Sequence, residues 1–268
     1  LGYGGTQLEA AGTRRVVRDS LAVGYRRMDT ARAYGNEEGV GQALRDSGLR
    51  RDEVFITSKV WIANAGQEKA AASIDESLRK LGCDYIDLML IHQPFGDDSG
   101  AWRAMEKLYA SGAVRAIGVS NFSAERLVDL CMNQKVKPMV NQIELHPFYQ
   151  QAEALKVMAL YGVVPQAWGP LAEAQKHIFE QKTLVKIAAS HEKTVAQVVL
   201  RWHYQRGVPT IPKTICQERM AENLDIFGFS LCEKEMNAIA ALDLGHSEII
   251  DHRCFYTARQ LNSVKIHG

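Results

Sequence analysis

Three ionisable side chains, those of Asp29, Lys59 and His92, each end a short apolar run of the chain, 30 and then 33 residues apart. That interval fits one strand followed by one helix. If the three runs are successive parallel strands of one barrel, their polar ends meet at its C-terminal rim, where barrel enzymes keep their chemistry. Tyr34 lies in the first loop, five residues after Asp29. A Tyr, a Lys, an Asp and a His can thus converge on one point, which predicts a proton-transfer site.

The elements that must position these residues repeat along the chain. Short apolar runs typical of strands alternate with stretches of helical spacing, such as Ile74, Leu78 and Leu81. The expected strands are residues 25–29, 54–59, 85–92, 114–120, 139–144, 163–168, 208–213 and a weaker run at 226–229. Eight alternations favour an α/β fold of the closed (β/α)8 or TIM barrel type over an open doubly wound sheet. We expect one domain over residues 1–268, and an N-terminal barrel-floor segment missing before Leu1.

Composition narrows the class of partner. The 268 residues carry a net charge of +1 with both signs interspersed, so neither nucleic acid nor membrane is expected as a partner. No apolar stretch approaches the roughly 20 residues of a membrane-spanning helix. The five cysteines are scattered without a CxxC pair, which predicts neither disulfides nor a metal site and favours a cytoplasmic location. We expect a monomer that binds a small molecule.

Six sequence blocks resemble the signature blocks of the aldo-keto reductase superfamily, in family order and spacing. They are DTARAYGNEE at 29–38, SKVW at 58–61, LIHQP at 90–94, GVSNF at 118–122, NQIELHP at 141–147 and IPKT at 211–214. The match runs essentially end to end. Within the superfamily, the segment AWGPL at 167–171 and the short loop after His92 are most similar to bacterial diketo-gluconate reductases.

The resemblance implies reduction of aldehydes, ketones or keto-sugars by NADPH. No side chain supplies hydride, so a nicotinamide cofactor must, and the protein supplies the proton. A phenol is a weak acid near neutral pH, but an adjacent ammonium group stabilises the phenolate. The implied tetrad therefore has Tyr34 as general acid and base, Lys59 and Asp29 as the pair that tunes it, and His92 as the residue that orients the substrate carbonyl.

The resemblance also implies how NADPH is held. Gly39 and Gly41 lack the third glycine of a dinucleotide-binding turn and fall in a helical pattern, so we interpret them as packing residues. The cofactor is then expected at the barrel rim. The expected contacts with the nicotinamide carboxamide are Ser120, Asn121 and Gln142, and Trp168 is expected to stack on the nicotinamide ring beside Gly169 and Leu171. The ribose phosphate is expected to contact Lys213, Thr214 and Arg219, and the adenine to contact Glu222 and Asn223. Further residues expected near the cofactor are Gly4, Gly5, Thr6 and Asp29.

Departures from the family pattern concern the substrate. Gln93 follows the catalytic His where many members have Trp, which favours a polar substrate, and Trp61 is expected to line the pocket. For His146 a structural role is favoured over a functional one. Two other functions stay open: a cofactor-binding regulatory subunit of the same fold with little turnover, which the complete tetrad disfavours, and an unrelated barrel hydrolase or lyase, which the missing metal-ligand motifs disfavour.

Overall fold

The computed structural model describes residues 1–5, 10–247 and 249–266, and its centre is a sheet of seven parallel strands in sequential order. Each strand pairs with the next along the chain, which is the topology of a barrel in which every connection returns to the same end. The strands are β1 (Tyr3–Gly4), β2 (Arg27–Asp29), β3 (Phe55–Val60), β4 (Leu88–Ile91), β5 (Ile117–Ser120), β6 (Val140–Glu144) and β7 (Val164–Trp168).

An extended segment at residues 208–213 closes the ring between β7 and β1. On one side Ala167 N donates to Pro209 O at 2.8 Å, and Ala167 pairs with Thr210 in a parallel bridge. On the other side Gly2 N donates to Thr210 O at 2.7 Å and Gly4 N to Pro212 O at 3.1 Å. We call residues 208–213 the closing segment. It supplies the eighth position of the barrel, so the predicted (β/α) barrel is confirmed.

The prediction of a strand at residues 226–229 is wrong. This stretch is a loop with a bend. Its apolar residues produced the strand-like pattern because they are needed for packing: Ile226 is buried and Phe229 packs against the core. In the ring, the place between the closing segment and β2 is occupied by β1 and not by residues 226–229. β1 has two residues, which are too few to show an alternating pattern.

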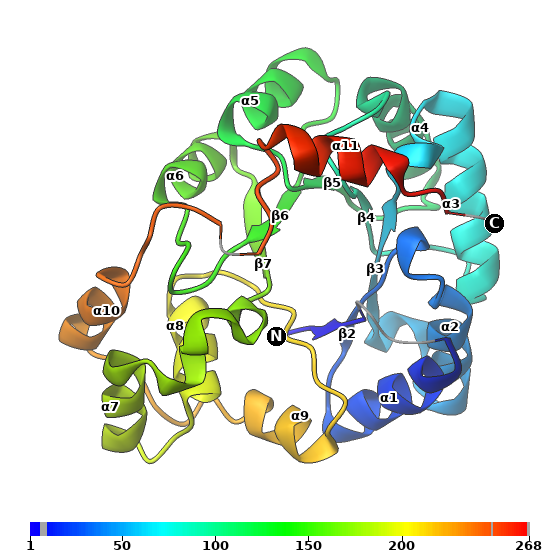
Figure 1. Ribbon diagram of the computed structural model, residues 1–268. Helices are drawn as coiled ribbons and strands as arrows, with labels where there is room; N and C mark the ends of the chain where they lie inside the picture. Colours follow the sequence, from blue (N-terminus) through cyan, green and yellow to red (C-terminus); the bar gives the residue numbers. More distant parts are fainter. Residues whose placement is uncertain (6–9, 248, 267–268) are drawn as a thin grey trace.

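Helices surround the strands (Figure 1). The α-helices are α1 (Ala10–Val23), α2 (Glu37–Asp46), α3 (Gln67–Leu81), α4 (Asp98–Ser111), α5 (Ala124–Asn133), α6 (Ala152–Tyr161), α7 (Lys182–Ser190), α8 (Val195–Gln205), α9 (Gln217–Leu224), α10 (Glu233–Ala240) and α11 (Phe255–Ser263). The 3-10 segments are η1 (Arg32–Tyr34), η2 (Arg51–Glu53), η3 (Ile62–Asn64) and η4 (Ala172–Glu180).

Gly41 shows why two neighbouring helices can approach closely. A Cβ atom built on Gly41 of α2 would lie 2.3 Å from the carbonyl oxygen of Leu81, the last residue of α3. Only glycine allows this contact without a shift of the backbone. The interpretation of Gly41 as a packing residue is thus confirmed.

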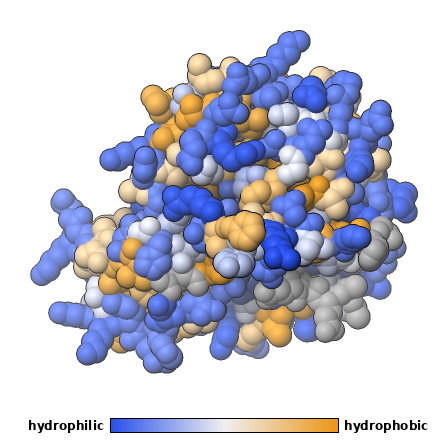
Figure 2. Space-filling view, turned by 45° about the horizontal axis from the view of Figure 1, so that its top comes forward, coloured by the Kyte–Doolittle hydropathy of each residue, from blue (hydrophilic) through white to orange (hydrophobic). Residues whose placement is uncertain are grey.

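The outer surface carries both hydrophilic and apolar side chains. The face in Figure 2 is mainly hydrophilic, with hydrophobic residues in groups between hydrophilic ones. Within the described ranges, no helix is both long and apolar enough to cross a bilayer.

Candidate active site

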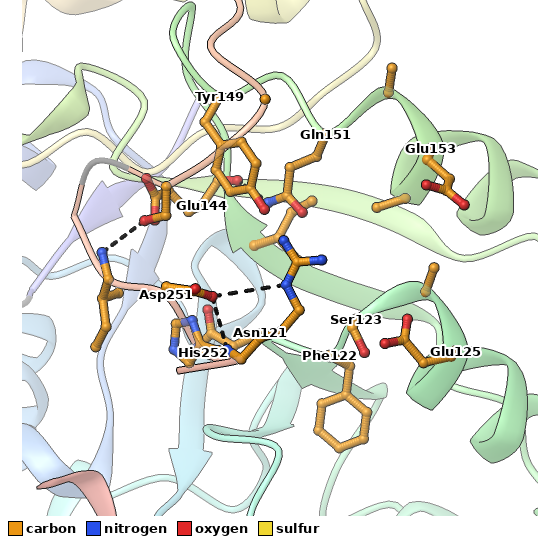
Figure 3. A pocket seen from close by; sticks show the side chains of 18 of the residues that line it. Asn121, Phe122, Ser123, Glu125, Glu144, Tyr149, Gln151, Glu153, Asp251 and His252 are labelled. Atoms are coloured by element: carbon orange, nitrogen blue, oxygen red, sulfur yellow. Dashed lines mark hydrogen bonds and ion pairs between the residues drawn. The ribbon is translucent and has the colours of Figure 1, made fainter. Parts of the chain in front are cut away.

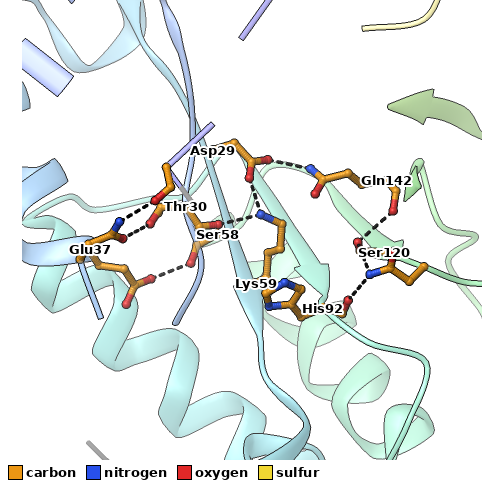
Figure 4. A network of polar contacts seen from close by, with 11 residues as sticks. Asp29, Thr30, Glu37, Ser58, Lys59, His92, Ser120 and Gln142 are labelled. Atoms are coloured by element: carbon orange, nitrogen blue, oxygen red, sulfur yellow. Dashed lines mark hydrogen bonds and ion pairs between the residues drawn. The ribbon is translucent and has the colours of Figure 1, made fainter. Parts of the chain in front are cut away.

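A buried ion pair lies at the centre of the site. Asp29 is the last residue of β2, and Lys59 stands on the neighbouring strand β3 with its Nζ against Asp29 Oδ1 and 3.0 Å from the Thr30 carbonyl oxygen (Figure 4). Gln142 of β6 donates from Nε2 to the other carboxylate oxygen at 2.7 Å. Burial lowers the pKa of Lys59, but Asp29 and then Tyr34 raise it by more, so the pKa of this ammonium group is raised overall. The site therefore holds a fixed positive charge.

Tyr34 lies over this charge. It ends η1, and the Lys59 Nζ atom is 5.2 Å from the centre of its ring. Polar contacts fix the loop that carries it: Thr30 Oγ1 donates to Asn36 Oδ1 at 2.6 Å, and Asn36 Nδ2 donates to the Gly5 carbonyl oxygen at 2.9 Å. Ser58 Oγ donates to Glu37 Oε1 at 2.6 Å just behind it. Asn36 and Glu37 belong to the matched block at 29–38, but the sequence assigned them no role.

His92 completes the group. It follows β4 directly, and its ring meets the Tyr34 ring nearly at right angles with centroids 5.6 Å apart. Burial, and then the charge of Lys59 and the neighbouring His252, hold the pKa of His92 well below its ordinary value. The ring is therefore neutral at neutral pH, and one nitrogen can donate to a carbonyl oxygen. The structure thus brings all four predicted tetrad residues together.

A second polar chain continues along the rim. Asn121 Nδ2 donates to the His92 carbonyl oxygen at 3.0 Å, and Asn121 Oδ1 accepts from Trp168 Nε1 at 2.8 Å. Asn121 has a φ of 63°, a left-handed conformation that asparagine tolerates better than most residues. Ser120 Oγ donates to the Gln142 carbonyl oxygen at 2.9 Å. These contacts hold three predicted carboxamide-binding residues and Trp168 side by side.

These residues line one cavity of about 830 Å³ at the carboxyl ends of the strands. The cavity extends from Tyr34 and His92 to the cations of Lys213 and Arg219. Burial lowers the pKa of Lys213, and the nearby carboxylate of Glu173 offsets part of this effect. The predicted site residues on its wall are Gly4, Tyr34, Trp61, His92, Gln93, Ser120, Asn121, Gln142, Trp168, Gly169, Leu171, Lys213 and Arg219.

Other predicted cofactor residues are placed away from this wall. Thr214 accepts a hydrogen bond from the Tyr3 hydroxyl at its carbonyl oxygen, and the Glu222 carboxylate accepts one from Thr194 Oγ1 at 2.7 Å. Asn223 is buried within α9. Gly5 N donates to the Asp29 carbonyl oxygen at 2.8 Å, in a contact that a Cβ atom would obstruct. Thr6 lies outside the described residues.

His146 lies away from the cavity wall. Its side chain is buried, and its Nε2 is 2.9 Å from Glu144 Oε1. This placement agrees with the structural role that the sequence favoured for it. Within the described residues, no group of His, Cys, Asp and Glu side chains could hold a metal ion.

The C-terminal part of the chain adds cavity residues that the sequence did not identify. Trp61 Nε1 donates to the Val264 carbonyl oxygen at 3.1 Å, so the segment after α11 is bonded to the cavity wall at Trp61. The additional wall residues from this part are Ile249, Ile250, His252, Leu261 and Val264. Sequence patterns could not identify these residues, because Trp61 and Val264 are about 200 residues apart and their contact follows no local pattern.

Comparisons with known proteins agree with this geometry. The model of the "Aldo/keto reductase family" matches residues 1–244. The chain is 47% identical over 228 residues to the glyoxal reductase of Bacillus subtilis (strain 168), covering 85% of this chain and 82% of that protein. It is 42% identical over 248 residues to the methylglyoxal reductase DkgA of Yersinia pestis, covering 91% and 89%. The structure of a Bombyx mori aldo-keto reductase in complex with NADP superposes with a TM-score of 0.87 at 31% identity, covering 94% and 91%.

Proposed function

Since this chain belongs to the aldo/keto reductase family, we propose that it is an NADPH-dependent reductase of aldehydes, ketones or keto-sugars with Tyr34 as its proton donor. The observation that carries the proposal is the buried Lys59–Asp29 pair next to Tyr34 and His92. Tyr34 and His92 themselves line a cavity that also reaches Lys213 and Arg219.

The residues present fit a nicotinamide dinucleotide phosphate. Asn121, Gln142 and Trp168 lie next to the tetrad, where an amide-bearing ring would be held. Lys213 and Arg219 lie on the same cavity wall and would bind a phosphate group. A Cβ atom on Gly4 would lie 2.8 Å from the Ile211 carbonyl oxygen, so glycine lets β1 and the closing segment pack closely where both line the cavity. The Bombyx mori relative, which was solved with NADP, supports the same cofactor.

Bound NADPH would supply the hydride that reduces the carbonyl carbon. The chain supplies the rest. The carbonyl oxygen gains its proton from the Tyr34 hydroxyl, and the resulting phenolate is stabilised by the Lys59 ammonium group, whose own charge is maintained by Asp29. The neutral His92 ring donates to the same carbonyl oxygen and so orients it toward Tyr34. Solvent returns the proton to Tyr34 after the alcohol leaves.

Reductive turnover tests the proposal. Purified protein with NADPH and a set of simple aldehydes, ketones and dicarbonyls should consume NADPH, measured by its absorbance, at rates that depend on the carbonyl compound. Dicarbonyls belong in the set because two relatives are named glyoxal and methylglyoxal reductases. NADPH binding without turnover of any carbonyl compound would favour the cofactor-binding regulatory subunit instead. Absence of NADPH binding would exclude both functions.

A further inference from the structure

His252 has no role in the tetrad, yet its ring lines the same cavity as Tyr34 and His92. It precedes α11 in the C-terminal part of the chain. Its ring meets the Trp168 ring at 76° with centroids 6.5 Å apart, and Figure 3 shows it beside Asn121. Together with Asn121 and Ile250 it also borders a second cavity of about 300 Å³, so it forms part of the partition between the two.

The ring has an unused hydrogen-bonding edge. Its Nε2 atom is buried and has no hydrogen-bond partner, and the same holds for Nδ1 of His92. A buried nitrogen without a partner is costly, and a ligand group that bonds to it removes that cost. Because no bond holds the Nε2 edge of His252, a turn of the ring about its Cβ–Cγ bond can present this edge to the cavity that the ring lines.

His252 is suited to bind a neutral oxygen. Burial lowers its pKa, while Glu144 and Asp251 offset part of that effect, so the ring is mainly neutral at neutral pH. A neutral imidazole both donates and accepts, and therefore matches either a carbonyl or a hydroxyl group. His252 and His92 line the same cavity, and the charge of His252 contributes to the lowering of the pKa of His92.

His252 is a polar residue among apolar ones on its side of the cavity. The other wall residues from the C-terminal part of the chain are all apolar, namely Ile249, Ile250, Leu261 and Val264. Gln93 is a further polar side chain on the cavity wall, and its Oε1 accepts a bond from Asn121 at 3.3 Å. Among the described wall residues from the C-terminal part of the chain, His252 is the one whose side chain can bond a second oxygen of the substrate.

We propose that His252 binds a second oxygen of the substrate, so that the enzyme favours carbonyl compounds with a neighbouring carbonyl or hydroxyl group over simple aldehydes of the same size. This inference rests on the proposed function. It assigns to His252 the discrimination between substrates, and leaves the chemical step to Tyr34, Lys59, Asp29 and His92.

The test compares two three-carbon substrates, methylglyoxal and propanal, by the ratio of their kcat/KM values. His252→Phe keeps a ring against Trp168 and removes both nitrogens, so this ratio should fall by roughly three- to tenfold, the effect of one neutral hydrogen bond. His252→Gln, whose amide reaches the region of Nε2, should keep more of the ratio than His252→Phe does. Arg253→Ala changes the exposed neighbour, whose side chain is 69% exposed, and serves as the control with an unchanged ratio.

The outcomes separate the inference from the proposed function. An unchanged ratio in His252→Phe, or an equal loss for both substrates, would overturn the role of His252 while leaving the reductase assignment intact. Wild-type protein that reduces neither substrate nor any other carbonyl would instead overturn the proposed function. Melting temperatures of the variants, compared with wild type, exclude misfolding as the cause of a changed ratio.

Discussion

The ammonium group of Lys59 and the carboxylate of Asp29 form an ion pair that is closed to solvent, with 0% and 1% of the two side chains exposed. Such a pair adds little to stability compared with apolar residues of similar volume, but removing one partner leaves the other charge buried and uncompensated. The pair is therefore best understood as the means of keeping one positive charge beneath Tyr34.

Asp29→Asn should destabilise the protein, since it removes the counter-charge of a buried ammonium group. The expected loss is about 3–5 kcal/mol in the free energy of unfolding, measured by urea denaturation. Asp46→Asn is the matched control, because Asp46 pairs with Arg14 at the surface and its loss should have little effect. Equal stability of Asp29→Asn and wild type would show that the ion pair is not charged in solution.

Tyr34→Phe keeps the ring and removes the proton. Carbonyl reduction should fall by roughly 10²- to 10⁴-fold, the range typical of a general acid. NADPH binding, followed by quenching of tryptophan fluorescence, should remain. Tyr109→Phe changes a half-exposed tyrosine of α4 in the same way and should leave turnover unaltered. Turnover near the wild-type value in Tyr34→Phe would exclude this residue as the proton donor.

Lys59→Met should depress kcat nearly as far as Tyr34→Phe, because the phenolate loses the charge that stabilises it. The two residues act as a unit in this mechanism, so the double variant should be little worse than either single one. The kinetic constants of the four proteins in this cycle measure the coupling. Losses that multiply in the double variant would show that Tyr34 and Lys59 act independently. Circular dichroism verifies that the variants are folded.

Arg219→Ala should weaken NADPH binding by roughly ten- to a hundredfold, the effect of one charge-assisted contact with phosphate. NADH lacks that phosphate, so its binding should change little, and the dependence of NADPH affinity on salt should become weaker. Further loss of preference is expected when Lys213 is also replaced. Arg50→Ala, at the opposite end of β3 from the cavity, is the control. Equal losses for the two nucleotides would exclude phosphate recognition by Arg219.

Acid should destabilise the protein through its buried imidazoles. His203 is completely buried, and burial followed by the charge of Arg206 holds its pKa well below 6.5. Below pH 6.5 the unfolded chain binds a proton at this residue and the folded chain does not, so the unfolding free energy falls with pH by up to about 1.4 kcal/mol per unit.

His203→Leu should reduce this slope, measured by urea denaturation between pH 5.5 and 7.5. His177→Leu, whose side chain is 85% exposed, should leave the slope unaltered. A slope that stays the same in His203→Leu would show that His203 titrates alike in the folded and unfolded states. His92 and His252 contribute in the same direction, since their pKa values are also lowered.

The sequence predicted where the tetrad lies because three of its residues are at or just beyond a strand, where local patterns are strong, and Tyr34 lies in the loop after the first of these strands. Asp29, Lys59 and His92 follow apolar runs whose ends can be identified within one or two residues. The same reasoning failed at residues 226–229, where the apolar residues of a loop that packs against the core produce a strand-like pattern. It also could not identify His252 or Val264, because their contacts with Trp168 and Trp61 depend on how distant loops fold over the barrel.

The closing segment has a consequence for biosynthesis. Gly2 and Gly4 bond to Thr210 and Pro212, and each pair is separated by 208 residues. On a ribosome that adds about 5–20 residues per second, β1 waits roughly 10 to 40 seconds for the partner that completes the ring. During that interval the nascent sheet has an unpaired edge, which is where chains associate wrongly. With only two residues, β1 offers a poor template for such pairing, so the brevity that hides this strand from sequence patterns also protects the unfinished chain.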